Sequence, residues 1–297
     1  MQTTRSLDIW AQWILHRRHG SDPQRLQAML AHLYPIRDRV LSQARCDDAS
    51  VLLDIGCGDG LIAFGALEKS ASCRVIFSDI SQDLLDHAAR LAVQMRLDGR
   101  CTFVRASADD LHEIADASVD AVTTRSVLIY VLAKQRAFEE FHRVLRPKGR
   151  LSIFEPINRF GEPQPDHMFW GFDVTPVAPI AAKLKDFYRR LLPLDSNPMM
   201  NFDERDLIAW AEAAGFRDVH LELQVTITPL SSQPDMPASW TTYLRSAANP
   251  KCPTFEEAMA QVLTPAERAT FEAHLRPRVE AKEGTFRSAV AYLWATK

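Results

Sequence analysis

Short β-type runs alternate with helical patterns through the middle of the chain. The β-type runs occupy residues 51–55, 74–78, 102–105, 119–124 and 150–154, and the helical patterns between them occupy residues 61–69, 81–97 and 134–145. The β-type runs are mostly apolar instead of alternating apolar with polar residues, which indicates strands buried on both faces. Strands that alternate with helices pair in parallel. The pattern therefore predicts a doubly wound α/β domain.

The same pattern resumes after residue 200 and runs to the end of the chain. A helical pattern begins at Asn201-Phe-Asp203 and stops at Gly215, a strand pattern follows over residues 218–228, and a last β-type run occupies residues 288–295. We therefore expect a mostly parallel, seven-stranded sheet.

Three stretches fall outside the repeating unit. Residues 1–48 show helical patterns and no strand pattern, so we predict an N-terminal helical cap there. Residues 49–297 then form a Rossmann-like domain with insertions over residues 156–202 and 229–285. The second insertion contains two S/T-x-x-E capping boxes, Thr254 to Glu257 and Thr264 to Glu267, which predict helices.

Glycines gather directly after the first predicted strand. The chain has only 11 glycines, yet Gly56, Gly58 and Gly60 follow residues 51–55. At the carboxyl end of a buried strand, glycines let the backbone turn sharply and approach a ligand closely. The alternative is a plain tight turn between strand and helix. Asp54 before the turn favours a small-molecule site at this edge of the sheet.

A second carboxylate, Asp79, ends the next predicted strand. In doubly wound folds, an acidic residue about twenty positions after the glycines accepts hydrogen bonds from a ribose diol. Asp79 could also cap the helix that begins near Ser81. The spacing differs from the dinucleotide pattern G-x-G-x-x-G, and no G-x-x-x-x-G-K-[ST] phosphate loop occurs. The sequence therefore favours a nucleoside ligand over a dinucleotide or a nucleoside triphosphate.

These motifs together resemble the class I S-adenosylmethionine-dependent methyltransferases, of the methyltransferase type 11/25 kind. The segments that carry the resemblance, within residues 48–156 and 202–227, are Asp54-Ile-Gly-Cys-Gly-Asp-Gly60, Asp79, Ser107-Ala-Asp-Asp-Leu111, Arg143-Val-Leu-Arg-Pro-Lys-Gly-Arg-Leu151 and Glu212-Ala-Ala-Gly-Phe216. Two departures stand out. Ser107 replaces the Asp or Asn of many relatives, which shifts the expected adenine contact toward Asp109 or the Ala108 amide. Lys148 stands where a glycine is usual, and we expect no consequence.

The resemblance implies a cofactor, S-adenosyl-L-methionine, which becomes S-adenosyl-L-homocysteine. The family pattern assigns the methionine end to the motif around Asp54, the ribose to Asp79 and the adenine to residues 107–109. The residues expected to bind the cofactor are Asp54, Gly56, Gly58, Asp79, Ile80, Ser107, Ala108, Asp109 and Arg125.

The tip of the fourth strand, Thr123-Thr-Arg-Ser126, narrows the range of acceptors. It lacks the [DN]-P-P-[YF] motif of amide-nitrogen enzymes and the carboxylates that hold Mg²⁺ in catechol-type enzymes, so we expect no metal and a small-molecule acceptor, methylated at O, N or C. We predict Glu155, Arg125 and His167 as catalytic residues: two bases and an arginine that contacts an anion. The alternatives are a surface cap for Glu155, a structural histidine and a local ion pair for Arg125.

The insertion over residues 156–202 is the expected acceptor lid, because its aromatic density suits an apolar or aromatic substrate. Its aromatic residues are Phe160, Phe169, Trp170, Phe172, Phe187, Tyr188 and Phe202. The same residues could instead pack the insertion onto the core or against a second copy in a homodimer. A non-catalytic cofactor-binding module, with the insertions as a partner-binding surface, is the alternative function.

Composition excludes several partners. The net charge is −3 with no basic stripe, which argues against nucleic acid. No run approaches 18 uninterrupted apolar residues, so we expect no membrane span and no secretory signal. The 5 cysteines form no C-x-x-C motif, which favours a reducing cytoplasm and no structural zinc.

Overall fold

The computed structural model describes residues 6–46, 51–194, 196–233, 236–237 and 239–297. The chain divides into two compact units, each described by itself. The sheet unit consists of Tyr34–Ile157, Pro198–Gln224 and Ala289–Lys297, and the helical unit consists of Met1–Leu33, Asn158–Asn197 and Val225–Ser288.

This division differs from the cap over residues 1–48 and the two insertions that we expected. The first 33 residues group with both inserted stretches in one unit, whereas Tyr34 and its successors group with the sheet. The physical reason lies in helix α2 (Pro23–Gln43), which is continuous through the boundary. Its last turns bury Val40 and Leu41 in the core of the sheet unit.

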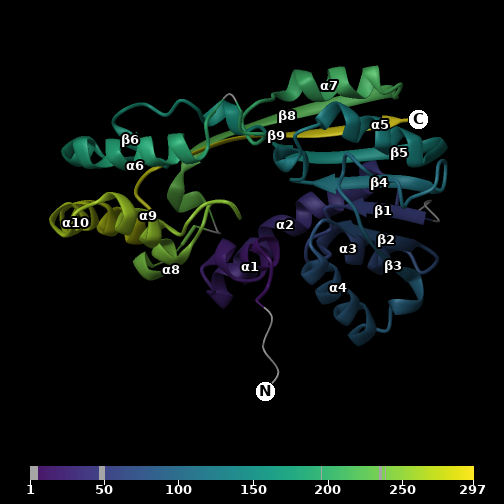
Figure 1. The fold of residues 1–297 in the computed structure, drawn as a ribbon, viewed down its shortest axis with the longest axis horizontal. Coiled ribbons are helices and arrows are strands. Elements are labelled where there is room, and N and C mark those ends of the chain that lie inside the picture. Colours follow the sequence, from purple (N-terminus) through teal and green to yellow (C-terminus); the bar gives the residue numbers. More distant parts are fainter. Residues whose placement is uncertain (1–5, 47–50, 195, 234–235, 238) are drawn as a thin grey trace. The chain divides into compact units, whose positions relative to one another are not determined.

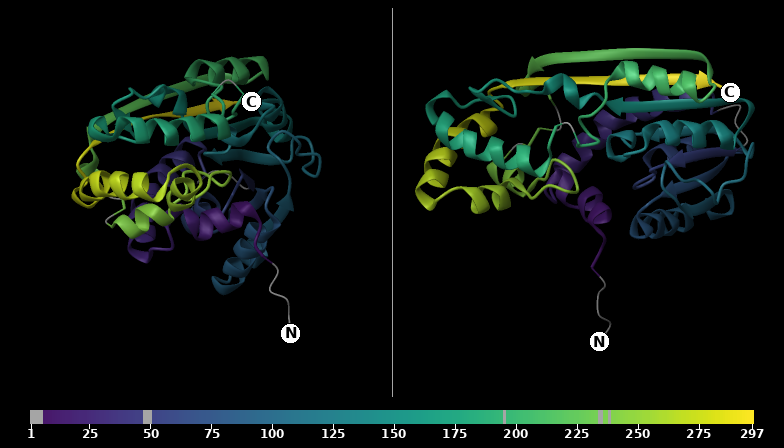
Figure 2. Two further views of the ribbon diagram at one scale, coloured as in Figure 1. Left: turned by 60° about the vertical axis from the view of Figure 1, so that its left-hand side comes forward. Right: turned by 45° about the horizontal axis from the view of Figure 1, so that its top comes forward.

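The sheet has seven strands in the order β3-β2-β1-β4-β5-β9-β8 (Figure 1). Their bounds are β1 Val51–Ile55, β2 Arg74–Asp79, β3 Cys101–Arg105, β4 Val119–Arg125, β5 Leu145–Pro156, β8 Arg217–Pro229 and β9 Thr285–Thr296. Strands β1 to β5 pair in parallel, and β9 runs antiparallel to β5. Figure 2 shows β8 and β9 as two long neighbouring strands, green and yellow. The seven-stranded, doubly wound prediction is confirmed.

Besides the last turns of α2, four helices flank the strands of the sheet unit within the part of the chain that the structure describes. They are α3 Leu61–Lys69, α4 Gln82–Gln94, α5 Lys134–Val144 and α7 Glu204–Ala213, with 3₁₀ turns η2 Asp98–Arg100 and η3 Leu128–Tyr130. Local capping fixes where two of them start: the Ser81 hydroxyl accepts from the Leu84 N–H, and Asp203 forms a capping box with Asp206. Phe64 of α3 and Phe77 of β2 are buried in the core of this unit.

The strand order reverses between β1 and β4. Strand β1 pairs with β2 on one side and with β4 on the other, and the chain leaves both β1 and β4 at the same edge. Ligands of open α/β sheets bind outside the carboxyl ends of the strands at such a switch point. The glycine turn and the tip of β4 therefore meet where a ligand site is expected.

The helical unit forms its own apolar core. Its elements are α1 Ile9–Leu15, η1 Arg17–His19, η4 Asn158–Gly161, β6 Met168–Phe169, β7 Phe172–Asp173, η5 Thr175–Val177, α6 Ala178–Leu191, η6 Leu230–Ser232, α8 Trp240–Arg245, α9 Phe255–Val262 and α10 Pro265–Ala281. Both predicted capping boxes are present, at the starts of α9 and α10.

Much of the aromatic density of residues 156–202 belongs to this core. Phe169 and Phe172 are buried, and the Phe169 ring contacts Phe255 and Phe271 with centroids 5.9 Å apart in each case. Phe202 lies in the sheet unit, where it is buried against α7. Of the two interpretations of these rings, packing therefore accounts for Phe169, Phe172 and Phe202.

Candidate functional site

The glycine turn after β1 has a conformation that other residues avoid. Gly56, Gly58 and Gly60 have φ angles of 63°, 56° and 88°. A Cβ on Gly56 would lie 2.4 Å from a methyl group of Val127, and one on Gly60 would lie 2.5 Å from the Phe64 ring. Glycine is therefore required at positions 56 and 60 by both dihedral angle and contact.

Asp79, the last residue of β2, holds this turn. Its Oδ2 accepts from the Gly58 N–H at 2.9 Å, and its Oδ1 accepts from the Ser81 N–H at 2.9 Å. The side chain is buried, and a carboxylate accepts up to about four hydrogen bonds, so one residue can serve the turn and a ligand together. The adjacent Ile80 is 43% exposed, an apolar surface beside the carboxylate that could lie against a flat base.

Asp54 lies buried one position before the end of β1. The Thr123 hydroxyl of β4 donates to its Oδ1 at 2.9 Å, whereas Oδ2 is buried with no hydrogen-bond partner among the residues that the structure describes. Burial raises the pKa of Asp54 to about 7, and Thr123, Arg125 and the Ala63 N–H oppose that rise.

Residues 107–110 form a compact turn after β3. The Ser107 hydroxyl donates to the carboxylate of Asp109, and the Asp110 N–H donates to the Ser107 carbonyl at 3.0 Å. Ala108 between them is buried. The short polar side chain of Ser107 is therefore engaged within the turn, which supports the expectation that Asp109 or the Ala108 amide carries the adenine contact.

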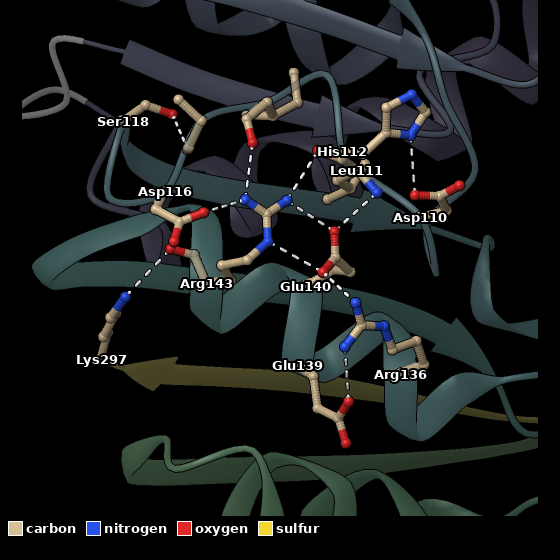
Figure 3. A network of polar contacts seen from close by, with 12 residues as sticks. Asp110, Leu111, His112, Asp116, Ser118, Arg136, Glu139, Glu140, Arg143 and Lys297 are labelled. Atoms are coloured by element: carbon tan, nitrogen blue, oxygen red, sulfur yellow. Dashed lines mark hydrogen bonds and ion pairs between the residues drawn. The ribbon is translucent and has the colours of Figure 1, made fainter.

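A network from α5 braces this segment (Figure 3). The buried Glu140 accepts from the Leu111 N–H at 2.9 Å, and Arg143 donates to the carbonyls of Leu111 and Ile114, each at 2.9 Å. Arg143 also pairs with Glu140 at 2.8 Å, and its guanidinium holds the pKa of Glu140 below the usual range. The arginine of the R-V-L motif thus fixes the segment that follows the turn at residues 107–110, a role that the sequence pattern did not reveal.

Glu155 has a different role from the one predicted. We expected a base near the acceptor, but its side chain is 0% exposed and accepts from three backbone N–H groups, those of Val127, Leu128 and Ile129, at 2.8, 2.9 and 3.3 Å. Burial raises its pKa to about 7 against these hydrogen bonds. The carboxylate holds the loop after β4 and is closed off from solvent, which favours a structural role over the predicted role as a base.

Lys134 is a buried cation that the sequence did not single out. It is 3% exposed, and its Nζ donates to the Val131 carbonyl at 2.9 Å and to Asn201 Oδ1 at 2.8 Å. Burial lowers its pKa to about 8. An open cavity of about 380 Å³ lies beside Lys134, Asn201 and Trp210, and none of the predicted cofactor residues lines it. Lys134 ties the loop between β4 and α5 to the start of α7.

The two other residues predicted to be catalytic, Arg125 and His167, belong to different units. Arg125 ends β4, half-buried, at the same edge as Asp54. His167 belongs to the helical unit, where its side chain is exposed. The structure brings Asp54, Asp79, Arg125 and the glycine turn together at the sheet edge of one unit, and His167 belongs to the other unit.

Neither a metal-binding cluster nor a membrane-spanning helix is found among the residues that the structure describes. No group of three or more His, Cys, Asp or Glu side chains within that part of the chain could hold a metal ion. None of the helices described is long and apolar enough to cross a membrane.

The geometry fits an adenosyl ligand with an amino-acid end. The turn excludes Cβ atoms at positions 56 and 60, Asp79 fixes the turn through the Gly58 N–H, and the buried Oδ2 of Asp54 has no partner among the described residues, as expected where a ligand ammonium completes the site. Fold and site together define a doubly wound domain that binds a nucleoside cofactor.

Comparison with known proteins identifies the family. Residues 53–153 match a family model described as a methyltransferase domain. Demethylmenaquinone methyltransferase of Clavibacter sepedonicus is 31% identical over 183 residues, which cover 60% of this chain and 71% of that protein. The ubiquinone/menaquinone biosynthesis C-methyltransferase UbiE of Rhodopseudomonas palustris (strain HaA2) is 35% identical over 116 residues, 39% of this chain and less than half, 46%, of the relative.

A solved structure shares the fold. Haemonchus contortus phosphoethanolamine N-methyltransferase 2, in complex with S-adenosyl-L-methionine, has a TM-score of 0.53 at 17% sequence identity, covering 97% of this chain and 56% of that one. The chain belongs to the class I S-adenosylmethionine-dependent methyltransferases. It is an enzyme whose cofactor is S-adenosyl-L-methionine. When bound, the cofactor supplies a methyl group activated by a sulfonium.

Proposed function

We propose that this methyltransferase acts on a small, mainly apolar or aromatic metabolite, with an aromatic ring that carries oxygen substituents as the preferred acceptor. The names of the two sequence relatives support the proposal, because each includes the name of a quinone: ubiquinone and menaquinone in one, demethylmenaquinone in the other. Those names describe the relatives, and the acceptor of this chain is our inference from them together with the chemistry of its side chains.

The observation that carries the proposal is a set of polar atoms inside the aromatic cluster of the helical unit. The hydroxyls of Tyr188 and Tyr243 and the indole N–H of Trp240 are buried without a hydrogen-bond partner among the described residues. Trp240 stacks on Tyr243 with ring centroids 5.7 Å apart, and Trp170 lies 5.0 Å from Tyr188. Aromatic faces with a few donors suit a ring that carries oxygen.

These groups remain donors at neutral pH. Burial raises the pKa of both Tyr188 and Tyr243, so the phenol form persists. A phenol or an indole that lacks a partner in the interior is costly, and a ligand oxygen would supply the missing acceptor. We therefore propose that the part of this cluster around Tyr188 is where residues 156–202 contact the acceptor.

The carboxylates of the sheet edge further limit the chemical class of the acceptor. Glu155 accepts hydrogen bonds from the backbone of the loop after β4, and Asp79 accepts one from the glycine turn, so both carboxylates are already engaged. A proton must be removed only when the attacking atom carries one that has to leave. An acceptor that ionises readily, such as a phenol or a hydroquinone, therefore suits this edge better than an alcohol or an amide.

The test is a transfer assay with methyl-labelled cofactor and a panel of hydroquinones, phenols, aliphatic amines and a metabolite extract. We expect label in small aromatic products, and we expect Asp79→Asn to reduce it strongly. Label found only on protein, or only on aliphatic amines, contradicts the proposal.

A second arm tests the aromatic cluster. Tyr188→Phe should raise the KM of the aromatic acceptor while the affinity for S-adenosyl-L-homocysteine stays unchanged. Tyr34→Phe, at a 43% exposed tyrosine of the sheet unit, is the matched control and should change neither. An unchanged acceptor KM in Tyr188→Phe overturns the assignment of this cluster.

A further inference from the structure

Strand β8 has one edge that the sheet leaves unpaired. It is the last strand in the order β3-β2-β1-β4-β5-β9-β8, so it pairs with β9 on one side and with no described strand on the other. It is a single strand of 13 residues that continues through the boundary between the two units. The outer N–H and C=O groups of an edge strand can pair with a strand of another chain. The outer edge of β8 is therefore a candidate interface.

The same strand carries exposed apolar side chains. Leu223, Val225 and Ile227 are 40%, 48% and 52% exposed, and they are the large apolar side chains that are exposed on the described strands. Because they are spaced two residues apart, they lie on one face of β8. The strand contains no lysine, and from Leu223 to its end it has no charged residue. Such an edge lacks the usual protection against pairing with another chain.

The residue pattern of β8 suits pairing with a second copy of itself. From Val219 to Ile227 the sequence is V-H-L-E-L-Q-V-T-I, with apolar residues at every odd-numbered position and polar residues at every even-numbered one. An antiparallel partner runs in the opposite direction, and an alternation of period 2 is the same in both directions. Residues directly opposite each other then share one face, so apolar side chains of the two copies meet on the same side.

Strand length defines the register of this pair. Leu223 is the midpoint of the 13 residues of β8, so pairing over the full length places Leu223 of one copy opposite Leu223 of the other. Leu221 then faces Val225, and Val219 faces Ile227. Every apolar residue of the face is thus opposite an apolar residue of the second copy, and these cross-strand pairs are the contacts that stabilise a sheet.

The charged residues agree with the same register. Glu222 faces Gln224, and neither Asp218 nor Arg217 faces a charged residue. A register centred one residue earlier would place Glu222 opposite Glu222, and like charges directly opposite each other are destabilising. Registers centred after Leu223 avoid that pair but shorten the ladder.

We propose that the outer edge of β8 is a homodimer interface, in which two copies of this chain pair their β8 strands antiparallel about a two-fold axis at Leu223. The partner is a second copy because it supplies a strand of equal length with a matching alternation and no opposed like charges. A two-fold interface uses the same surface of both copies, so the assembly closes at two and leaves no β8 edge free. The interface depends on neither the acceptor nor the cofactor.

The first test is the mass of the intact chain in solution, measured by sedimentation velocity over a wide range of concentrations. We expect a dimer whose dissociation constant rises by about tenfold or more in Leu223→Lys, because two ammonium groups then meet at the axis. Leu132→Lys, at a 75% exposed leucine outside the strands, is the matched control and should leave the dissociation constant unchanged. A chain that is monomeric at every concentration overturns the proposal, as do equal effects of the two substitutions.

The second test measures the register in chains that keep the charge of the strand. Under mild oxidation, Leu223→Cys should crosslink to itself, because residues directly opposite each other have Cβ atoms about 4.5–5.5 Å apart. Val225→Cys should not, since it lies four residues, about 13 Å, from its counterpart along the ladder. A mixture of Leu221→Cys and Val225→Cys chains should crosslink. The wild-type chain, which keeps its 5 native cysteines, gives the background.

Affinity for S-adenosyl-L-homocysteine confirms that each variant is folded, and it should equal that of the wild type throughout. Crosslinking of Val225→Cys as fast as that of Leu223→Cys overturns the proposed two-fold axis. So does crosslinking of neither Leu223→Cys nor the mixture at concentrations where the wild-type chain is a dimer.

Discussion

The backbone N–H of Gly58 donates a hydrogen bond of 2.9 Å to Oδ2 of Asp79. The carboxylate predicted to contact the ribose therefore also fixes the glycine turn, and its second oxygen accepts from Ser81, the N-cap of α4. Three tasks meet in one side chain because a carboxylate can accept several hydrogen bonds at once. Changes at this residue should consequently affect both binding and folding.

Asp79→Asn should impair both properties. An amide has one acceptor oxygen, so its nitrogen must face the N–H of either Gly58 or Ser81, and one of those donors loses its partner. We expect the affinity for S-adenosyl-L-homocysteine to fall by about tenfold or more, since a charge-assisted hydrogen bond contributes about 1.5–3 kcal/mol. Calorimetry together with denaturant unfolding measures the two effects. Asp98→Asn, on the exposed turn η2, is the control, and unchanged affinity in Asp79→Asn contradicts the ribose assignment.

Cofactor affinity should depend on pH through Asp54. Burial raises its pKa to about 7, the charge of Asp79 adds to the rise, and Arg125, Thr123 and the Ala63 N–H oppose it. The proposed contact with the cofactor ammonium requires the ionised carboxylate. Affinity should therefore rise by up to about tenfold between about pH 6 and about pH 8.

Variants separate the two groups that titrate in this range. Glu155 also has a pKa of about 7, and its carboxylate interacts electrostatically with Arg125. Glu155 is therefore the competing source of a pH effect. Asp54→Asn should flatten the pH profile of S-adenosyl-L-homocysteine binding, whereas Glu155→Gln should preserve its shape. A profile that Asp54→Asn leaves unaltered removes Asp54 from the contact.

Substitution of Glu155 should change the free energy of unfolding more than the rate of methyl transfer. Its folded pKa of about 7 exceeds the usual value of 4.5, so between these values the folded chain retains a proton that the unfolded chain has lost. The contribution of Glu155 to the free energy of unfolding therefore decreases as pH rises from about 4.5 through about 7. We expect the difference in stability between wild type and Glu155→Gln to be larger at about pH 5 than at about pH 8. A difference that is the same at both values argues against a buried, pKa-shifted carboxylate.

Arg143 should support the adenine segment from a distance. Its planar fork reaches the carbonyls of Leu111 and Ile114 and the carboxylate of Glu140, and a lysine ammonium cannot serve all three. Arg143→Lys should lower the free energy of unfolding by about 2 kcal/mol, a value reduced for its 27% exposed side chain, and should weaken cofactor binding. The neighbouring Arg146→Lys, with a 42% exposed side chain and an ion pair to Asp120, should change both much less. Equal effects of the two substitutions contradict the bracing role.

Local signals made most of the sheet predictable. Apolar runs marked the strands, the S/T-x-x-E boxes marked the starts of α9 and α10, and Gly56 with Asp79 marked the sheet edge where the cofactor is expected. Each of these signals depends on neighbours in the chain or on a backbone angle that few residues adopt. Such requirements are visible in the order of residues alone.

Features that depend on distant contacts were not predictable. No pattern in the neighbouring sequence indicated that Glu155 would accept hydrogen bonds from the N–H groups of residues 127–129. None indicated that Phe169 would pack in a core with Phe255. The grouping of the first 33 residues with both inserted stretches depends on the same kind of contact. A polar residue in a buried strand, as Thr123 is, was the one available signal of the hydrogen bond to Asp54.

Lys148 gives the sharpest test of the resemblance to the family pattern. We expected no consequence where lysine replaces the usual glycine, but Lys148 has a φ angle of 69°, in the left-handed region. Its N–H donates to the carbonyl of Lys297 and the Lys297 N–H donates to Gly149, so the flanking backbone is fixed in this conformation. The left-handed conformation costs a residue with a side chain about 1–2 kcal/mol.

Lys148→Gly should therefore stabilise the protein. The relief of strain is partly offset by the greater flexibility of glycine in the unfolded chain, about 0.5–1 kcal/mol, which leaves a net gain of about 0.5–1 kcal/mol. Lys148→Ala is the matched control: it removes the same exposed side chain and keeps the strain, so it should give no gain. Denaturant unfolding of the three chains measures the effect, and cofactor affinity should stay the same in all of them. If alanine stabilises as much as glycine does, the lysine side chain and not its backbone angle is the source of the cost.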